Sequence, residues 1–243
     1  MAQNDIDFNS NGEITGIQNY EEKSLCCFVL DTSSSMAQSP DGYPIDELNK
    51  GLQHFHSEIK TNSITTDRLE VAVVTFNSTV EVVQPPLLTT QFEMPHLSTA
   101  GSTQLVTGVR KGIELIQEKK NWYKQTGQPY LRPWVILITD GAPDSGQDVA
   151  GLSQEIEVGT KNKDYVFLPI GVEGAKMKIL NQIAGYTKKP GGDWGKMEAM
   201  KLKGLNFFEF FKWVSASMSG IIGSDADTTD LPSPNWWEGH TVE

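Results

Sequence analysis

The sequence predicts an α/β domain in which a mainly parallel sheet carries helices on both faces and one antiparallel strand at its edge. Two short apolar runs, residues 25–30 and 134–139, are bounded by polar residues, as buried strands are. Elsewhere apolar residues recur every three or four positions, which is typical of amphipathic helices. Strands that alternate with helices favour parallel pairing through right-handed crossovers.

The first half of the chain contains the predicted antiparallel pair. After the strand at 25–30, a helix is expected from residue 44 to about residue 60, because its apolar residues form one stripe. Strands over 69–76 and 79–83 are separated by Asn77-Ser78, which is typical of a tight turn. This hairpin places one antiparallel strand at the edge of the sheet.

The second half continues the alternation. The expected elements are a helix over 103–123, a strand over 135–139, a helix over 148–161, a strand over 165–170, a short helix over 177–184, a strand near 200–202 and a helix over 206–221. Residues 188–196 are rich in glycine and are expected to form a loop. The last helix carries a stripe of large apolar residues, interpreted as core rather than as a partner-binding surface: Phe207, Phe210, Phe211, Val214 and Met218.

Length and charge predict one principal domain with polar ends. The 243 residues, 38% of them hydrophobic, suffice for one substantial core. We expect an amino-terminal extension over 1–24, the domain over 25–223 and an acidic, tryptophan-containing tail over 224–243. Much of the net charge of −11 lies at the ends, since each end carries five acidic residues and at most one basic residue. This balance argues against nucleic-acid or anionic-membrane binding.

Several features favour a cytoplasmic protein. The sequence has no apolar run of about 18 residues, and its amino terminus lacks the pattern of a signal peptide. Cys26 and Cys27 are the only cysteines, and as neighbours on a strand they should face opposite sides of the sheet. We interpret them as buried free thiols in a reducing compartment.

Polar residues follow the two apolar strands where ligands would meet them. Asp31, Ser33 and Ser35 come directly after the strand at 25–30, and Asp140 follows the strand at 135–139. Thr103 lies in a small polar loop between them. The carboxyl ends of parallel strands share one edge, where ligands bind in open α/β sheets. Carboxylate and hydroxyl oxygens suit Mg²⁺, although Mn²⁺ and Ca²⁺ accept the same ligands and such turns also cap helices.

This combination resembles the von Willebrand factor A (vWA) domain and its metal-ion-dependent adhesion site. The resemblance implies a Rossmann-like fold in which Asp31, Ser33 and Ser35 form the first metal loop, Thr103 the second and Asp140 the third. It also implies that a Glu or Asp of a protein partner completes the metal sphere. Gly101 and Gly141 would allow close backbone approach rather than bind the ion.

Three further strings are similar to bacterial TerY-like vWA proteins, which are associated with tellurium resistance. They are residues 202–218, residues 44–52, and Leu231-Pro232 followed by Trp236-Trp237. This similarity implies a stress or phospho-signalling role, with a protein kinase or phosphatase of the same system as partner.

Two other functions stay open at this point. The metal could be structural, with a partner docking on the termini; Trp236-Trp237 could equally anchor a partner or pack back onto the domain. A metal-dependent hydrolase would need a positioned acid or base, and none of the four histidines lies near a motif loop. We therefore expect a non-catalytic protein whose oligomeric state the sequence does not indicate.

Overall fold

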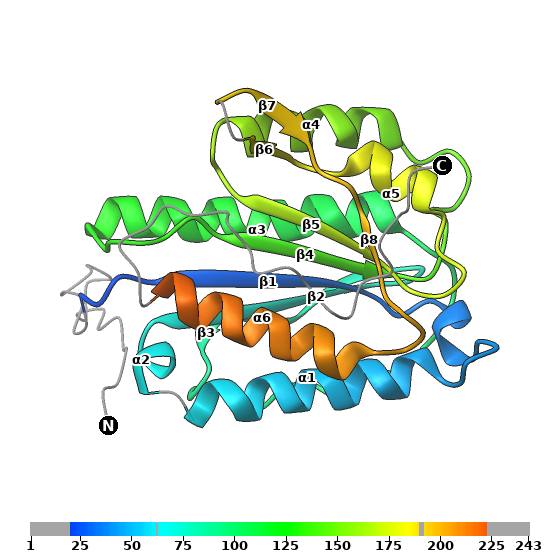
Figure 1. Cartoon of the computed structure of the whole chain (residues 1–243), viewed down its shortest axis with the longest axis horizontal. Helices are drawn as coiled ribbons and strands as arrows, with labels where there is room; N and C mark the ends of the chain where they lie inside the picture. Colours follow the sequence, from blue (N-terminus) through cyan, green and yellow to red (C-terminus); the bar gives the residue numbers. More distant parts are fainter. Residues whose placement is uncertain (1–19, 62, 190–191, 223–243) are drawn as a thin grey trace, which may run out of the picture.

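The computed structural model describes residues 20–61, 63–189 and 192–222. The tail at 224–243 and most of the amino-terminal extension lie outside these residues. Within them, a six-stranded sheet has the order β3-β2-β1-β4-β5-β8 (Figure 1). Its strands are β1 (Ser24–Asp31), β2 (Leu69–Phe76), β3 (Val80–Leu88), β4 (Trp134–Thr139), β5 (Val166–Gly171) and β8 (Met200–Lys201).

The pairing confirms a mainly parallel sheet with one antiparallel edge strand. Strand β1 pairs in parallel with β2 on one side and with β4 on the other, and β5 continues from β4. Strand β3 pairs antiparallel with β2, as the hairpin predicted. It runs further than expected, through Pro85-Pro86, because an edge strand tolerates proline. Strand order therefore reverses at β1, where open α/β sheets place their ligand crevice.

Helices cover both faces of the sheet, as expected. Helices α1 (Pro44–Thr61) and α6 (Phe207–Ile222) pack on one face. Helices α3 (Leu105–Thr126), α4 (Val149–Lys161) and α5 (Met177–Ile183) pack on the other. The apolar stripe of α6 is buried and contributes to the core, as predicted. Cys26 and Cys27 belong to the two opposite core clusters, which confirms their placement on different faces.

The prediction of a loop over residues 188–196 is wrong. Strands β6 (Tyr186–Lys188) and β7 (Trp194–Lys196) pair as a short antiparallel hairpin. The ammonium group of Lys161 on α4 lies 4.5 Å from the centre of the Tyr186 ring, which ties the hairpin to that helix. The sequence also gave no sign of the 3₁₀ helix η1 (Ser34–Ala37) or of the short α2 (Ser63–Thr66).

Candidate metal site

The two predicted carboxylates lie at the ends of neighbouring central strands. Asp31 is the last residue of β1, and Asp140 directly follows β4. The parallel register pairs Leu30 with Ile138, which brings the carboxyl ends of both strands to the same edge of the sheet. Asp31 is fully buried and Asp140 is 7% exposed. The sheet edge thus holds two carboxylates that are largely shielded from water.

The first loop connects these carboxylates through serine hydroxyls. The backbone N–H of Ser33 donates to Asp31 Oδ1 at 2.8 Å. The Ser33 and Ser35 hydroxyl oxygens are 3.0 Å apart, and Ser35 Oγ donates to Asp140 Oδ1 at 2.7 Å. Helix η1 begins at Ser34 and turns the chain so that both hydroxyls face this edge. The structure therefore brings these four predicted residues into one hydrogen-bonded chain.

The second loop adds Thr103, the fifth predicted residue. A Cβ atom placed on Gly141 would lie 3.5 Å from Thr103 Oγ1 and 3.6 Å from Asp31 Oδ2, so all three loops converge at this point. The loop is attached to the first one because the N–H of Ser34 donates to the carbonyl of Gly101 at 3.1 Å.

Gly101 is required by the geometry of this loop. Its φ of +67° lies in the left-handed region. A Cβ atom there would stand 2.2 Å from Ser78 Oγ. Ser78 belongs to the β2–β3 turn, and its Oγ accepts a hydrogen bond from the N–H of Ser102 at 2.9 Å. The Asn77-Ser78 turn thus frames the same edge.

Two positioning residues were missed by the sequence analysis. Thr139 donates to Asp31 Oδ2 at 2.5 Å and accepts from the N–H of Gly141 at 3.1 Å. Asp144 accepts from the N–H of Thr103, with its two carboxylate oxygens at 3.2 and 3.1 Å. Thr139 could have been found, since parallel pairing of the two strand ends places its hydroxyl level with Asp31. The sequence contains no comparable signal for Asp144, because its hydrogen bond with Thr103 joins two loops that are far apart in the sequence.

Buried negative charge dominates the electrostatics of the site. Burial raises the pKa of Asp31 to about 6, despite hydrogen bonds from Ser33 and Thr139. Burial also raises the pKa of Asp140. Among the ion pairs of the described residues, none involves either carboxylate. A buried carboxylate normally has a cationic partner, so the arrangement fits a bound cation.

The donor set indicates which kind of cation would fit. In the described part of the chain, no group of three or more His, Cys, Asp or Glu side chains is placed to hold a metal ion. At this edge, two carboxylates stand together with three hydroxyls. Such an all-oxygen set suits a hard divalent cation such as Mg²⁺ better than Zn²⁺, which prefers nitrogen and sulfur ligands.

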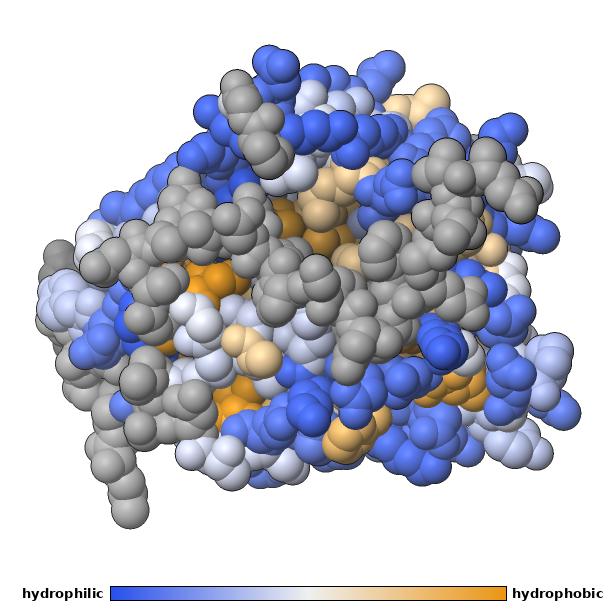
Figure 2. All heavy atoms as spheres, in the orientation of Figure 1, coloured by the Kyte–Doolittle hydropathy of each residue, from blue (hydrophilic) through white to orange (hydrophobic). Residues whose placement is uncertain are grey.

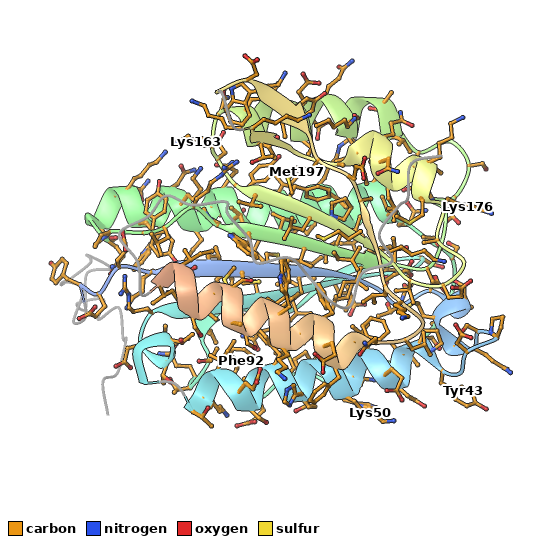
Figure 3. All side chains as sticks on the ribbon, viewed as in Figure 1. Tyr43, Lys50, Phe92, Lys163, Lys176 and Met197 are labelled. Atoms are coloured by element: carbon orange, nitrogen blue, oxygen red, sulfur yellow. The ribbon has the colours of Figure 1, made fainter. Side chains whose placement is uncertain are left out.

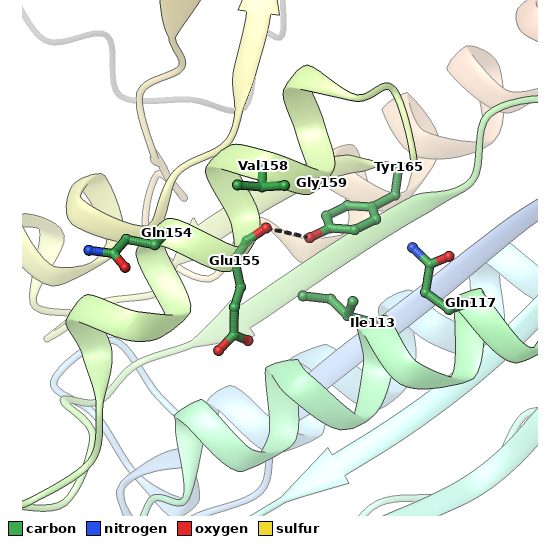
Figure 4. A pocket seen from close by; sticks show the side chains of 7 residues that line it. All are labelled: Ile113, Gln117, Gln154, Glu155, Val158, Gly159 and Tyr165. Carbon is green, nitrogen blue, oxygen red and sulfur yellow. Dashed lines mark hydrogen bonds between the residues drawn. The ribbon is translucent and has the colours of Figure 1, made fainter.

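A shallow groove between α3 and α4 contains none of the five predicted residues (Figure 4). It has a volume of about 480 Å³ and is lined by Ile113, Val158 and Tyr165, among others. The Tyr165 hydroxyl donates to the carbonyl of Glu155 at 3.5 Å, and burial raises its pKa far above the usual value. This apolar lining offers no cluster of reactive or metal-binding groups. The strand-end edge therefore remains the candidate site.

Residues 26–193 match the family model of the von Willebrand factor type A domain. The chain belongs to this family. Domains of the family often bind a metal at an adhesion site of this kind, mediate protein interactions and are typically non-catalytic. No curated protein sequence matches the chain. Within the described residues, no helix combines the length and apolarity that crossing a membrane requires.

Solved structures share the vWA fold at low sequence identity. The pilus adhesin SpaC from Lactobacillus rhamnosus GG aligns with a TM-score of 0.58 and 12% identity over 83% of this chain and 31% of its own. The PilB minor pilin from Streptococcus sanguinis has a TM-score of 0.53 and 15% identity, over 87% of this chain and 64% of its own. The ArnB paralog VWA2 from Sulfolobus acidocaldarius has a TM-score of 0.51 and 15% identity, over 81% of this chain and 45% of its own. This chain therefore spans less than two thirds of each.

Proposed function

We propose that this vWA domain binds a divalent cation, Mg²⁺ in the first instance, and uses it to bind a protein partner. The ligands are Asp31, Ser33, Ser35, Thr103 and Asp140. One observation carries the proposal: two buried carboxylates share an edge and a serine hydroxyl chain, with no basic side chain paired to them in the described residues. A cation supplies the missing positive charge.

The chain's own residues hold the ligands in place for this role. Thr139 and the N–H of Ser33 fix the two oxygens of Asp31, while Asp144 anchors the loop that carries Thr103. When bound, the cation supplies an electrophilic centre whose charge the two carboxylates formally cancel. An incoming Glu or Asp of the partner therefore meets little net repulsion and completes the oxygen ligands. Mn²⁺ and Ca²⁺ accept the same donor set.

A non-catalytic role agrees with the surroundings of the site. In the described residues, the serines of the first loop hydrogen-bond to each other and to a carboxylate, not to a histidine or lysine that would activate a nucleophile. Two of the histidines are engaged on α1. His56 lies 2.9 Å from the carbonyl of Thr89, and His54 stacks on Phe208.

The partner proposed is a protein kinase or phosphatase of a bacterial stress system, in the cytoplasm. Support for this comes from the sequence strings similar to TerY-like proteins, two of which overlap α1 and α6. A partner of this kind would present a Glu or Asp side chain at the strand-end edge.

Metal binding is tested by thermal unfolding in chelator and in increasing Mg²⁺. At a free Mg²⁺ concentration 100 times its dissociation constant, binding should stabilise the fold by about 2.7 kcal/mol. Asp31→Ala should remove most of that stabilisation, whereas Asp41→Ala, on an exposed turn, should retain it. An undiminished response in the Asp31 variant would place the metal elsewhere.

Partner binding is tested by pull-down from native lysate with the same two variants and the wild type, each in Mg²⁺ and in chelator. We expect a partner that only the wild type and Asp41→Ala retain, and only in Mg²⁺. Identical partners in every lane would contradict metal-mediated recognition.

A further inference from the structure

Residues 89–100 join β3 to the loop that carries Thr103, and they form neither helix nor strand. We call them the connecting segment. Two of its side chains, Met94 and Leu97, are buried in the core cluster to which α1 and α6 contribute. A buried backbone group without a hydrogen-bond partner destabilises a protein, so a buried segment without secondary structure needs side chains that bind its backbone.

Helix α1 supplies such side chains from one of its faces. Asn49, Gln53 and His56 are separated by four and three residues, which places them on the same side of the helix. The Nε2 of Gln53 donates to the carbonyl of Met94 at 2.9 Å, and the Nε2 of His56 lies 2.9 Å from the carbonyl of Thr89. The connecting segment is therefore bound along about two turns of α1.

Asn49 differs from the polar residues on the outer surface of α1, because it is buried. Figure 2 shows mainly hydrophilic side chains over this helix on the face in view, and Figure 3 labels the exposed Lys50 on its outer side. Figure 3 also labels Phe92 of the connecting segment beside α1, where its ring stacks on His56 with ring centres 5.0 Å apart. Asn49 is only 5% exposed, and a buried amide needs specific hydrogen-bond partners.

Asn49 binds the connecting segment at two points. Its Nδ2 donates to the carbonyl of Leu97 at 2.9 Å, and its Oδ1 accepts from the N–H of Leu97 at 2.8 Å. The side chain thus pairs with both backbone groups of Leu97, as a neighbouring strand would. This requires a group that donates and accepts at the same time, which a primary amide does and a carboxylate does not.

The chain beyond Leu97 reaches the first metal loop within a few residues. The N–H of Ala100 donates to the carbonyl of Thr32 at 2.8 Å. The next residue, Gly101, accepts the hydrogen bond from Ser34 described above. Asn49 therefore holds the connecting segment just before the point where the second metal loop attaches to the first.

We propose that Asn49 is a positioning residue for the metal site. By holding the backbone of Leu97, it keeps the loop of Thr103 in contact with the loop of Asp31. It acts through the connecting segment and binds no metal itself. The inference rests on the metal binding proposed above and extends it to a helix outside the three loops. Mg²⁺ demands near-octahedral ligands at closely fixed distances, so a small shift of one loop should weaken binding.

Calorimetric titration with Mg²⁺ is the first test. Asn49→Leu removes both hydrogen bonds to Leu97, and Asn49→Asp keeps the size of the side chain and the acceptor but loses the donor. Each should weaken Mg²⁺ binding about 10-fold. The control, Ile59→Ala, removes a buried side chain about three turns further along the same helix, and should lower the melting temperature while binding Mg²⁺ like the wild type. Equal affinity in all four proteins, or an equal loss in the control, would overturn the inference.

Amide hydrogen exchange of the metal-free proteins is the second test, and it separates this inference from the metal proposal. The N–H groups of Ser34 and Ala100 report whether the two loops stay in contact. In chelator, both should exchange about 10-fold faster in Asn49→Leu than in Ile59→Ala. A wild type that binds no Mg²⁺ would count against the metal proposal. Unaccelerated exchange at these two amides would overturn the positioning role of Asn49 whether or not the metal binds.

Discussion

Replacing Asp31 by Asn should stabilise the protein when no metal is present. Burial raises the Asp31 pKa from 3.8 to about 6, so ionising this carboxyl in the folded protein costs about 3 kcal/mol relative to the unfolded chain. An Asn side chain carries no charge and avoids that cost. It still accepts the Ser33 N–H, but it loses the acceptor for the Thr139 hydroxyl, which costs about 1 kcal/mol. Above pH 7, the free energy of unfolding of Asp31→Asn should therefore exceed that of the wild type by about 2 kcal/mol.

The stability of the metal-free wild type should fall as the pH rises, because of Asp31. Because the folded pKa is raised, the contribution of Asp31 to stability is present below pH 4 and is lost as the pH rises through about 6. The free energy of unfolding of the wild type should therefore fall relative to that of Asp31→Asn over this interval. At pH 7.5 in chelator, the variant should melt about 4–8 °C higher. Saturating Mg²⁺ should reverse the order, because it stabilises only the wild type.

Thermal and denaturant unfolding between pH 4 and 8, in chelator, provide the measurement. Asp41→Asn makes the same chemical change on an exposed turn and should shift stability by less than about 0.5 kcal/mol. If Asp31→Asn were no more stable than the wild type at pH 7.5, and its pH profile ran parallel, the reasoning from an uncompensated buried charge would be refuted.

Three further substitutions test the framework around the site and the core. Asp144→Asn weakens the anchor of the Thr103 loop and should reduce Mg²⁺ affinity roughly 10- to 100-fold by calorimetric titration, with little change in metal-free stability. Unchanged affinity would show that the loop holds its position without this carboxylate. Gly101→Ala introduces a left-handed alanine against a serine of the β2–β3 turn, and should cost about 1–3 kcal/mol in urea unfolding. A cost near zero would mean that the β2–β3 turn shifts to accommodate the added methyl group. Gly51→Ala puts a methyl group 2.5 Å from the Phe211 ring between α1 and α6, and should cost about 1–3 kcal/mol without altering Mg²⁺ binding. A stabilising effect would contradict close packing there.

Local patterns of apolar residues in the sequence predicted much of the fold. The strand at residues 69–76 was predicted with the bounds the structure has, and α1 was predicted to within one residue. Apolar periodicity reflects which side of an element faces the core, so it is strong where an element is long and buried. It failed at residues 188–196, where short strands next to glycines left no periodicity to read. There the hairpin is held by contact between its own Tyr186 and Lys161 of α4.

The sequence by itself determined five of the side chains that assemble at the candidate site. Asp31 ends one buried strand and Asp140 directly follows another, and parallel pairing of the two strands brings these ends to one edge. Only the tertiary structure decided how those carboxylates are held and charged. Thr139 and Asp144 act across strands or loops. The raised Asp31 pKa depends on how completely the converging loops exclude water. Solvent exclusion is a property of the packed assembly, and no local pattern encodes it.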